Sequence, residues 1–275
     1  MRFGFYTPNV DFCGDASVLA DLAHQAEEAG WDGFFIWDTL QYVEPTVDPW
    51  IALAAMAMRT ERIRLGPVIT PVPRRHIAKL AREVISLDHL SNGRVVLGVG
   101  AGYPAYPEYT AFGDDGDRRT RASKLDEGLE VLAGLWSGKP VKHHGTHYHV
   151  ECAGFQPPVQ QPRVPVWVAA TWPNKKPLRR AARWDGVVPM TQDPDAGPGL
   201  EPSELRSLVG YIAAHRSSTE PFDVVQLGRT NDPHDTAKVE ACAEAGATWW
   251  LEYVFTEDTS LEGARARLRE GPPRP

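Results

Sequence analysis

The sequence predicts a closed (β/α)8 barrel of the TIM type, with a small hairpin insertion, in one domain spanning residues 1–275. Short apolar segments alternate with amphipathic helical segments along the whole chain. The clearest unit runs from Ile63 to Gly102, where two apolar segments flank a helical one, the pattern of parallel strands joined by a helical crossover. An open doubly wound sheet would more often carry a GxGxxG turn after its first strand, where this chain has TPNVDF.

Local signals justify the elements in the first half of the chain. The first helix has apolar residues at helical spacing and ends at Gly30, and Asp48 and Pro49 suit the N-cap and first turn of the second. The expected strands are Arg2–Tyr6, Gly33–Trp37, Ile63–Thr70 and Val95–Val99. The expected helices are about Ala16–Ala29, Pro49–Arg59, His76–Leu90 and Arg118–Trp136.

The second half continues the alternation after a hairpin at Val141–Val150 that turns at Gly145 and Thr146. The expected strands are Val166–Ala170, Gly186–Pro189, Val224–Gly228 and Thr248–Tyr253. The expected helices are about Pro177–Arg183, Ser203–Arg216, Asp235–Ala245 and Leu261–Arg269. His147 and His149 would share a strand face of the hairpin, a spacing that could bind zinc, but the ligand set is thin, so we favour a solvated hairpin and expect no metal.

Bulk composition limits the classes of function. The formal net charge of −7 argues against general nucleic-acid binding, which needs a basic face. The three cysteines are far apart and indicate reduced thiols rather than a disulfide framework. No segment has the apolar core of a signal peptide or the length of a membrane span. We therefore expect a cytoplasmic protein with a small-molecule substrate and no nucleic-acid or membrane partner.

In a barrel, the carboxyl ends of the strands converge at one end, which we call the mouth. The residues at these ends are hydroxyl-bearing, glycine-rich and aromatic, with no histidine and no catalytic pair of carboxylates. Such a site suits an organic cofactor that brings its own reactivity. At Gly100, Ala101 and Gly102, main chain with few side chains would let a flat ligand approach closely.

A candidate anion site follows the fifth strand. Thr171 ends that strand, and Asn174 then opens a helix with Lys175 and Lys176 near its start. Unpaired N–H groups, the positive helix end and two ammonium groups would hold a phosphate. The residue types alone leave this interpretation level with that of a solvated basic helix face.

Four segments carry a family resemblance: AEEAGWDGFFIWD, RIRLGPVITPVPRRHIAKLAREVISLDHLSNGRVVLGVGAG, PLRRAARWDGVVP and GATWWLEY. On these the chain resembles the bacterial luciferase-like monooxygenase superfamily of flavin- and deazaflavin-dependent oxidoreductases. The resemblance implies a barrel that binds FMN or coenzyme F-420 (8-hydroxy-5-deazaflavin), a cis peptide bond around Pro67–Ile69, and a homodimer as an expectation. It places the cofactor ring near Val68, Ile69, Thr70, Gly100, Ala101 and Gly102, and the phosphate near Thr171, Asn174, Lys175 and Lys176.

The candidate catalytic residues are Asp38, Thr39 and Glu252. Many deazaflavin-dependent members have histidine where this chain has Thr39, and some have glutamate where it has Tyr103, which argues against sugar-phosphate dehydrogenase activity. Asp38 could instead hold the turn, and Glu252 could form a buried salt bridge to an arginine. Hydride transfer or oxygen insertion on a small organic substrate remains, with a non-catalytic flavin-binding protein as the alternative.

Three further features at the mouth stay open at this point. Arg74 and Arg75 could contact an acidic cofactor tail or solvate a turn. Tyr103, Tyr106 and Tyr109 could cover the substrate or pack the rim. Of Trp249 and Trp250, one must face the barrel interior and the other the helices, because neighbouring side chains of a strand alternate.

Overall fold

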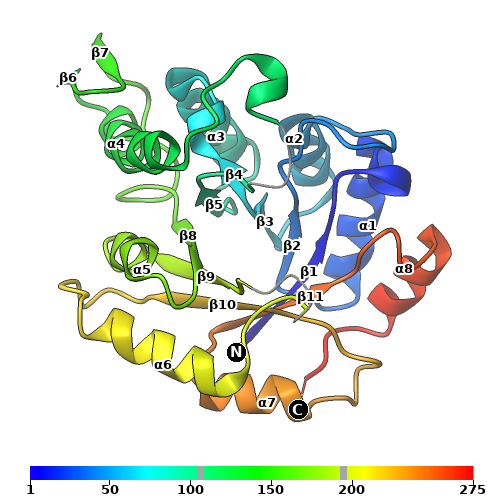
Figure 1. The fold of residues 1–275 in the computed structure, drawn as a ribbon. Coiled ribbons are helices and arrows are strands. Elements are labelled where there is room, and N and C mark those ends of the chain that lie inside the picture. The colour runs from blue at the N-terminus through cyan, green and yellow to red at the C-terminus, as the bar shows by residue number, and fades with distance from the viewer. Residues whose placement is uncertain (104–107, 193–196, 275) are drawn as a thin grey trace.

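Parallel strands curve around a central axis, and helices pack on their outer side (Figure 1). The computed structural model describes residues 1–103, 108–192 and 197–274. Its nine-stranded parallel sheet has the order β3-β2-β1-β11-β10-β9-β8-β5-β4. The strands are β1 (Arg2–Thr7), β2 (Gly33–Ile36), β3 (Arg64–Pro67), β4 (Thr70–Pro71), β5 (Leu97–Gly100), β8 (Val166–Thr171), β9 (Gly186–Met190), β10 (Asp223–Gly228) and β11 (Trp249–Tyr253).

The helices follow the strands as the hydrophobic pattern predicts. They are α1 (Ala16–Glu28), α2 (Pro49–Arg59), α3 (Ile77–Leu90), α4 (Arg118–Trp136), α5 (Lys175–Ala181), α6 (Pro202–Ala213), α7 (Ala237–Glu244) and α8 (Leu261–Arg269). Short 3-10 turns are η1 (Asp11–Cys13), η2 (Val72–Arg74) and η3 (Thr110–Phe112). Asp48 caps α2 as expected, since its carboxylate accepts hydrogen bonds from the N–H groups of Trp50 and Ile51. In the described part of the chain, no helix is long and apolar enough to cross a bilayer.

The third barrel strand departs from the prediction of one continuous strand over Ile63–Thr70. It is broken into β3 and β4 at the peptide bond between Val68 and Ile69, which is cis, within the range that the resemblance implied. Leu65 bridges to Val95, and the N–H of Val96 donates to the carbonyl oxygen of Leu65 at 2.8 Å. These contacts bring β3 against β5 and close the sheet, so the predicted barrel is confirmed.

The predicted hairpin insertion is present as β6 (Val141–His144) and β7 (His149–Cys152), which pair antiparallel beside α4 (Figure 1). The prediction that His147 and His149 share a strand face is wrong, because His147 lies in the turn and β7 begins at His149. The carboxylate of Glu127 on α4 accepts hydrogen bonds from the N–H groups of His147 and Tyr148 and holds the turn.

Two apolar cores stabilise the barrel, one inside the sheet and one between sheet and helices. The inner core consists of Tyr6, Phe35, Val68, Val96, Trp167, Val188, Val225, Leu227, Trp249 and Leu251. Trp249 therefore faces the interior, and Trp250 faces the helices with the outer core. Gly66 has to be glycine, because a Cβ there would lie 1.8 Å from the carbonyl oxygen of Val96.

Candidate functional site

The mouth has two opposite sides, set by the strand order. Counting β3 and β4 as one barrel strand, three strands separate β5 from β11 in either direction around the sheet. Gly100, at the end of β5, thus lies across the barrel from Tyr253, at the end of β11. A ligand over the β5 side faces residues of β11 and its neighbours.

The predicted ring-binding residues lie together on the β5 side. Thr70 and Pro71 pair with Val99 and Gly100, which puts the end of β4 beside the end of β5. Ile69, Ala101, Gly102 and Thr171 are each half-buried there, whereas Val68, Thr70 and Gly100 are buried. Val68 takes part in the inner core, and its carbonyl oxygen accepts a 2.6 Å hydrogen bond from the hydroxyl of Tyr6.

The glycines on this side are already in contact with protein side chains. A Cβ on Gly100 would lie 2.8 Å from Cγ2 of Ile69, and one on Gly102 would lie 2.6 Å from the ring of Tyr109. Gly102 also has a φ of +82°, which favours glycine. Side chains therefore lie close to the main chain at Gly100 and Gly102, and Ile69 and Ala101 are half-buried beside them.

Tyr109 packs the rim, one of the two roles considered for the tyrosines. Its hydroxyl donates to the carbonyl oxygen of Ala101 at 3.1 Å, and the guanidinium of Arg121 lies 4.7 Å from its ring centre. Burial raises the pKa of Tyr109 to about 12, so the phenol stays protonated as a donor. Tyr103 is 54% exposed, and Tyr106 lies outside the described residues.

Asp38 belongs to a cluster of paired charges between β2, β4 and the segment after β5. Its carboxylate accepts hydrogen bonds from the hydroxyl of Thr70 at 2.8 Å, from Nη2 of Arg74 at 2.6 Å and from Nη2 of Arg75. Arg74 also pairs with Glu108, and only 4% of its side chain is exposed. Both arginines are therefore ion-pair partners of Asp38 rather than solvated turn residues, with the side chain of Arg74 buried and that of Arg75 half-buried.

Glu108 and Asn9 complete the polar contacts at the mouth and were not among the predicted site residues. Oε1 of Glu108 accepts from the N–H of Leu40 at 2.6 Å, and the amide of Asn9 donates to the carbonyl oxygen of Thr39 at 3.1 Å. Asn9 follows the first strand closely, which is a usable signal. Glu108 has no such signal, because its partners lie 68 and 34 positions away along the chain.

The predicted anion site is exposed but only partly directed outward. Asn174 is the N-cap of α5, which begins at Lys175, two residues before the expected start, because Pro177 is tolerated in a first turn. The ammonium of Lys175 lies 4.9 Å from the ring centre of Trp172 and 4.2 Å from that of Tyr211. Lys176 is exposed. Thr171 ends β8 half-buried, at the inner edge of this segment.

Glu252 faces the helices instead of the mouth. It shares the outer face with Trp250, whose indole N–H donates to it at 2.9 Å, and it is 1% exposed. The N–H of Thr230 donates to it at 2.8 Å, and Arg267 lies 3.5 Å away. This geometry favours the buried salt bridge over a catalytic role, because the carboxylate is directed away from any ligand at the mouth.

The imidazoles of the hairpin pair with protein groups. His143 contacts the carboxylate of Glu127 at 3.0 Å, and His147 contacts the hydroxyl of Ser123 at 2.9 Å. Across residues 1–103, 108–192 and 197–274, no three His, Cys, Asp or Glu side chains are grouped so that they could hold a metal ion.

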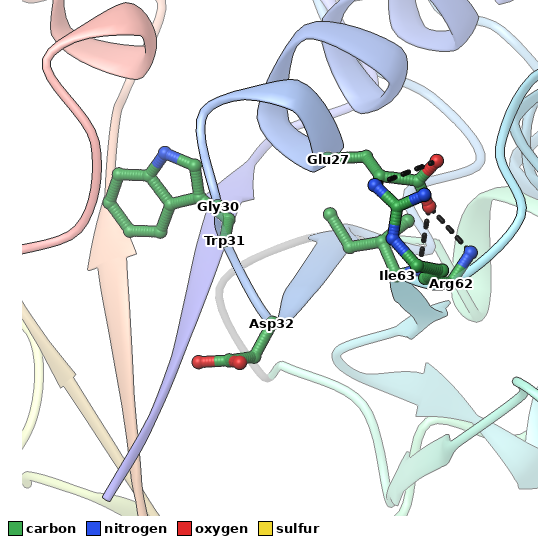
Figure 2. Close-up of a pocket in the computed structure, with 6 residues that line it drawn as sticks. All are labelled: Glu27, Gly30, Trp31, Asp32, Arg62 and Ile63. Atoms are coloured by element: carbon green, nitrogen blue, oxygen red, sulfur yellow. Dashed lines mark hydrogen bonds and ion pairs between the residues drawn. The ribbon is translucent and has the colours of Figure 1, made fainter.

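A hollow of about 300 Å³ lies at the opposite end of the barrel, before β2 and β3 (Figure 2). Its wall includes Trp31, Asp32 and the carboxylate of Glu27, which accepts hydrogen bonds from the N–H groups of Arg62 and Ile63 at 2.6 and 2.8 Å. Since conserved chemistry in such barrels sits at the carboxyl ends of strands, we interpret this end as a stabilising region.

Two curated dehydrogenases are similar to this chain in sequence. An F-420-dependent glucose-6-phosphate dehydrogenase of Microbacterium testaceum is 34% identical over 202 residues, which cover 71% of this chain and 58% of that protein. A second such dehydrogenase, of Nakamurella multipartita, is also 34% identical over 188 residues, which cover 63% of this chain and 51% of that protein. The matched part of the chain spans about half the length of these curated dehydrogenases.

Solved structures share the fold at low sequence identity. An F-420-dependent secondary alcohol dehydrogenase in complex with an F-420–acetone adduct has a TM-score of 0.78 at 17% identity, covering 99% of this chain and 98% of that one. The oxygenating constituent of a diketocamphane monooxygenase of Pseudomonas putida, in complex with FMN, has a TM-score of 0.66 at 19% identity, covering 85% and 69%. The model of the luciferase-like monooxygenase family matches residues 1–258. The chain therefore belongs to the luciferase-like monooxygenase family.

Proposed function

We propose that this protein is an oxidoreductase that uses FMN or coenzyme F-420 for hydride transfer to, or oxygen insertion into, a small organic substrate. One observation carries the proposal. The β5 side of the mouth changes from a half-buried, mostly apolar strip at Ile69, Ala101, Gly102 and Thr171 to an exposed basic segment that contains Lys176. Such a surface fits a ligand with a flat apolar ring and an anionic arm. The F-420- and FMN-dependent relatives support both carriers.

In this proposal the bound carrier supplies the redox chemistry, and the protein positions it and limits access of water. Val68, Ile69, Thr70, Gly100, Ala101 and Gly102 would hold the ring, and Thr171, Asn174, Lys175 and Lys176 the phosphate. Asp38 would act as a positioning residue, because its carboxylate is occupied by Thr70 and two arginines. Thr39 would contribute through its place beside the ring, with its main chain held by Asn9.

Titration with each carrier, followed by absorption and fluorescence, tests the proposal directly. We expect at least one carrier to bind, and we expect the double variant Lys175→Ala, Lys176→Ala to weaken binding about 2- to 30-fold, as exposed ion pairs contribute ~0.2–1 kcal/mol each. Lys139→Ala, on the segment between α4 and β6, serves as the matched control. If neither FMN nor coenzyme F-420 binds at millimolar concentration, the proposed function is overturned. If the double variant binds the carrier as tightly as the wild type, only the phosphate assignment is removed.

A non-catalytic flavin-binding protein is the second candidate. The occupied carboxylate of Asp38 and the absence of an imidazole at Thr39 favour it, because neither residue provides a ready proton donor. Reduction of the carrier-loaded protein, followed by reoxidation with and without organic substrates, separates the two candidates. Substrate-dependent reoxidation supports the enzyme, and reoxidation at the same rate with every substrate supports the binding protein.

We also propose that the protein acts on a small molecule rather than on nucleic acid, and that it forms a homodimer. The net charge of −7 supports the first point, and the frequency of dimers in the family supports the second. Sedimentation equilibrium of the full chain tests the dimer: a mass near 30.4 kDa at all concentrations would contradict it.

A further inference from the structure

The layer of side chains that covers the inner core at the mouth is apolar. Trp37, Ile69, Met190 and Tyr253 are half-buried and pack on the inner core of the barrel from above. They come from the ends of different strands, so together they form the top layer of the interior. Ile69 belongs to the proposed ring site, and Met190 pairs with Thr171 on the same side. Trp37 and Tyr253 are therefore the part of this layer that a second ligand would contact.

A row of aromatic rings extends this layer across β1, β2 and β11. The ring centres of Tyr6 and Tyr253 are 5.4 Å apart, those of Tyr253 and Phe255 are 5.7 Å apart, and those of Phe255 and Trp37 are 5.3 Å apart. The ring centre of Trp37 is 6.4 Å from that of Tyr42. The three closer pairs are tilted by 30–37°. We call these five residues the aromatic row.

The β11 end of the aromatic row lies opposite the proposed cofactor, whereas Tyr6 at its other end donates a hydrogen bond to the carbonyl oxygen of Val68 in the proposed ring site. Tyr253 ends β11 and Phe255 follows it, and β11 is the strand farthest around the barrel from β5 with its Gly100. A planar molecule bound between the two sides would therefore have the carrier's ring on one side and protein rings on the other. Aromatic pairs contribute attraction beyond the burial of their area.

Among residues 1–103, 108–192 and 197–274, the charges near the aromatic row do not favour an anionic substrate. Arg229, whose guanidinium lies 5.7 Å from the ring centre of Tyr253, is paired with Asp258 at 2.6 Å. The hydroxyl of Tyr42 donates to the carboxylate of Glu257 at 3.2 Å. On the other flank, Arg74 is paired with two carboxylates. A phosphate ester would have to break one of these pairs or approach a carboxylate.

We infer that the substrate is a neutral molecule with a planar aromatic group, which stacks on the aromatic row at Trp37, Tyr253 and Phe255. The inference rests on the proposed function, because it places the substrate against a carrier bound at the β5 side. It distinguishes this chain from its sugar-phosphate-oxidising relatives by the chemistry of the surface that faces the carrier.

The test compares two ketones that differ only in whether the ring is aromatic. The protein is first saturated with whichever of FMN and coenzyme F-420 it binds. Isothermal titration calorimetry then measures the binding of acetophenone, cyclohexyl methyl ketone and glucose 6-phosphate. We expect acetophenone to bind about 2- to 10-fold more tightly than the cyclohexyl ketone, as aromatic pairs imply. We expect glucose 6-phosphate to bind more weakly than either. Phe255→Leu keeps an apolar side chain but removes one of the rings, and it should lower the ratio of the two ketone affinities.

Phe155→Leu is the matched control, because Phe155 packs beside Arg82, far from the aromatic row, and it should leave the ratio unchanged. Melting temperatures and carrier affinities of both variants show whether each still folds and binds the carrier. Equal affinities for the two ketones, an unchanged ratio in Phe255→Leu, or tighter binding of glucose 6-phosphate would overturn the inference while the proposed function stands. If neither carrier binds in the first titration, the proposed function fails and the inference fails with it.

Discussion

Replacing Arg74 by methionine should reveal how strongly the mouth depends on its buried charge cluster. The guanidinium lies between Asp38, whose side chain is 0% exposed, and Glu108, whose side chain is 10% exposed. Methionine keeps an unbranched apolar stem but leaves these carboxylates without the guanidinium that they share. Removing one member of a buried ion pair costs about 3–5 kcal/mol, because an uncompensated charge stays away from water.

The expected loss lies at the lower end of this range, about 3 kcal/mol, because Arg75 still pairs with Asp38 after the substitution. For a chain of this size the corresponding decrease in melting temperature is about 6–12 °C. Circular dichroism melts and urea unfolding of the full chain measure both quantities. Arg62→Met is the control: its side chain is 72% exposed, so a change within about 0.5 kcal/mol is expected.

A double-mutant cycle separates the ion pair from simple loss of packing. Glu108→Gln removes one of the two charges stranded by Arg74→Met, so the double variant should lose about 1–3 kcal/mol less than the sum of the single variants. Additive losses, or a loss below about 1 kcal/mol in Arg74→Met, would refute the view that paired charges hold the segment after β5 to the loop after β2.

Three further substitutions have expected outcomes. Glu27→Gln should lower the free energy of unfolding by about 1–3 kcal/mol at neutral pH. Burial raises the pKa of Glu27, but hydrogen bonds from the N–H groups of Arg62, Ile63 and Glu61 outweigh it and hold the pKa below its ordinary 4.5. The carboxylate therefore stabilises the fold above pH 4.5, and the difference from wild type should shrink as pH falls through the lowered pKa in urea titrations; a constant difference would contradict this. Gly102→Ala should destabilise the protein by about 1–2 kcal/mol, because alanine is strained at a φ of +82° and its Cβ would meet Tyr109; an unchanged melting temperature argues against that packing. Glu252→Gln should lower stability by about 1–3 kcal/mol and leave carrier affinity within twofold, and weaker carrier binding without loss of stability would return Glu252 to the site.

The local elements could be predicted because their causes are local. The helix Pro49–Arg59 was predicted with the observed bounds, since Asp48 and Pro49 mark its start. Arg118–Trp136 was likewise predicted correctly from its spaced leucines. The break between β3 and β4 was not predicted, although Gly66 and Pro67 lie within Ile63–Thr70 and are residues that often interrupt a strand.

Side-chain partners across the barrel were harder to predict. The sequence left Glu252 between a catalytic carboxylate and a salt bridge, and only the alternation of β11 inside a closed sheet turns it toward Arg267. Arg74 was assigned to a cofactor tail or a turn, because its partner Glu108 comes from a segment 34 positions away. The roles of Val68 to Thr70 and of Lys175 and Lys176 toward a cofactor stay predictions.

The sequence by itself determined the barrel, the order of its elements and the family. The barrel and the order of its elements follow from hydrophobic periodicity and helix capping, which act over a few residues. The family follows from the resemblance carried by four segments of the chain. Only the tertiary structure decided that Asp38, Arg74 and Glu108 neutralise one another and that Trp37, Tyr253 and Phe255 form one row. The physical reason is closure of the sheet, which brings into contact side chains that no short-range pattern connects.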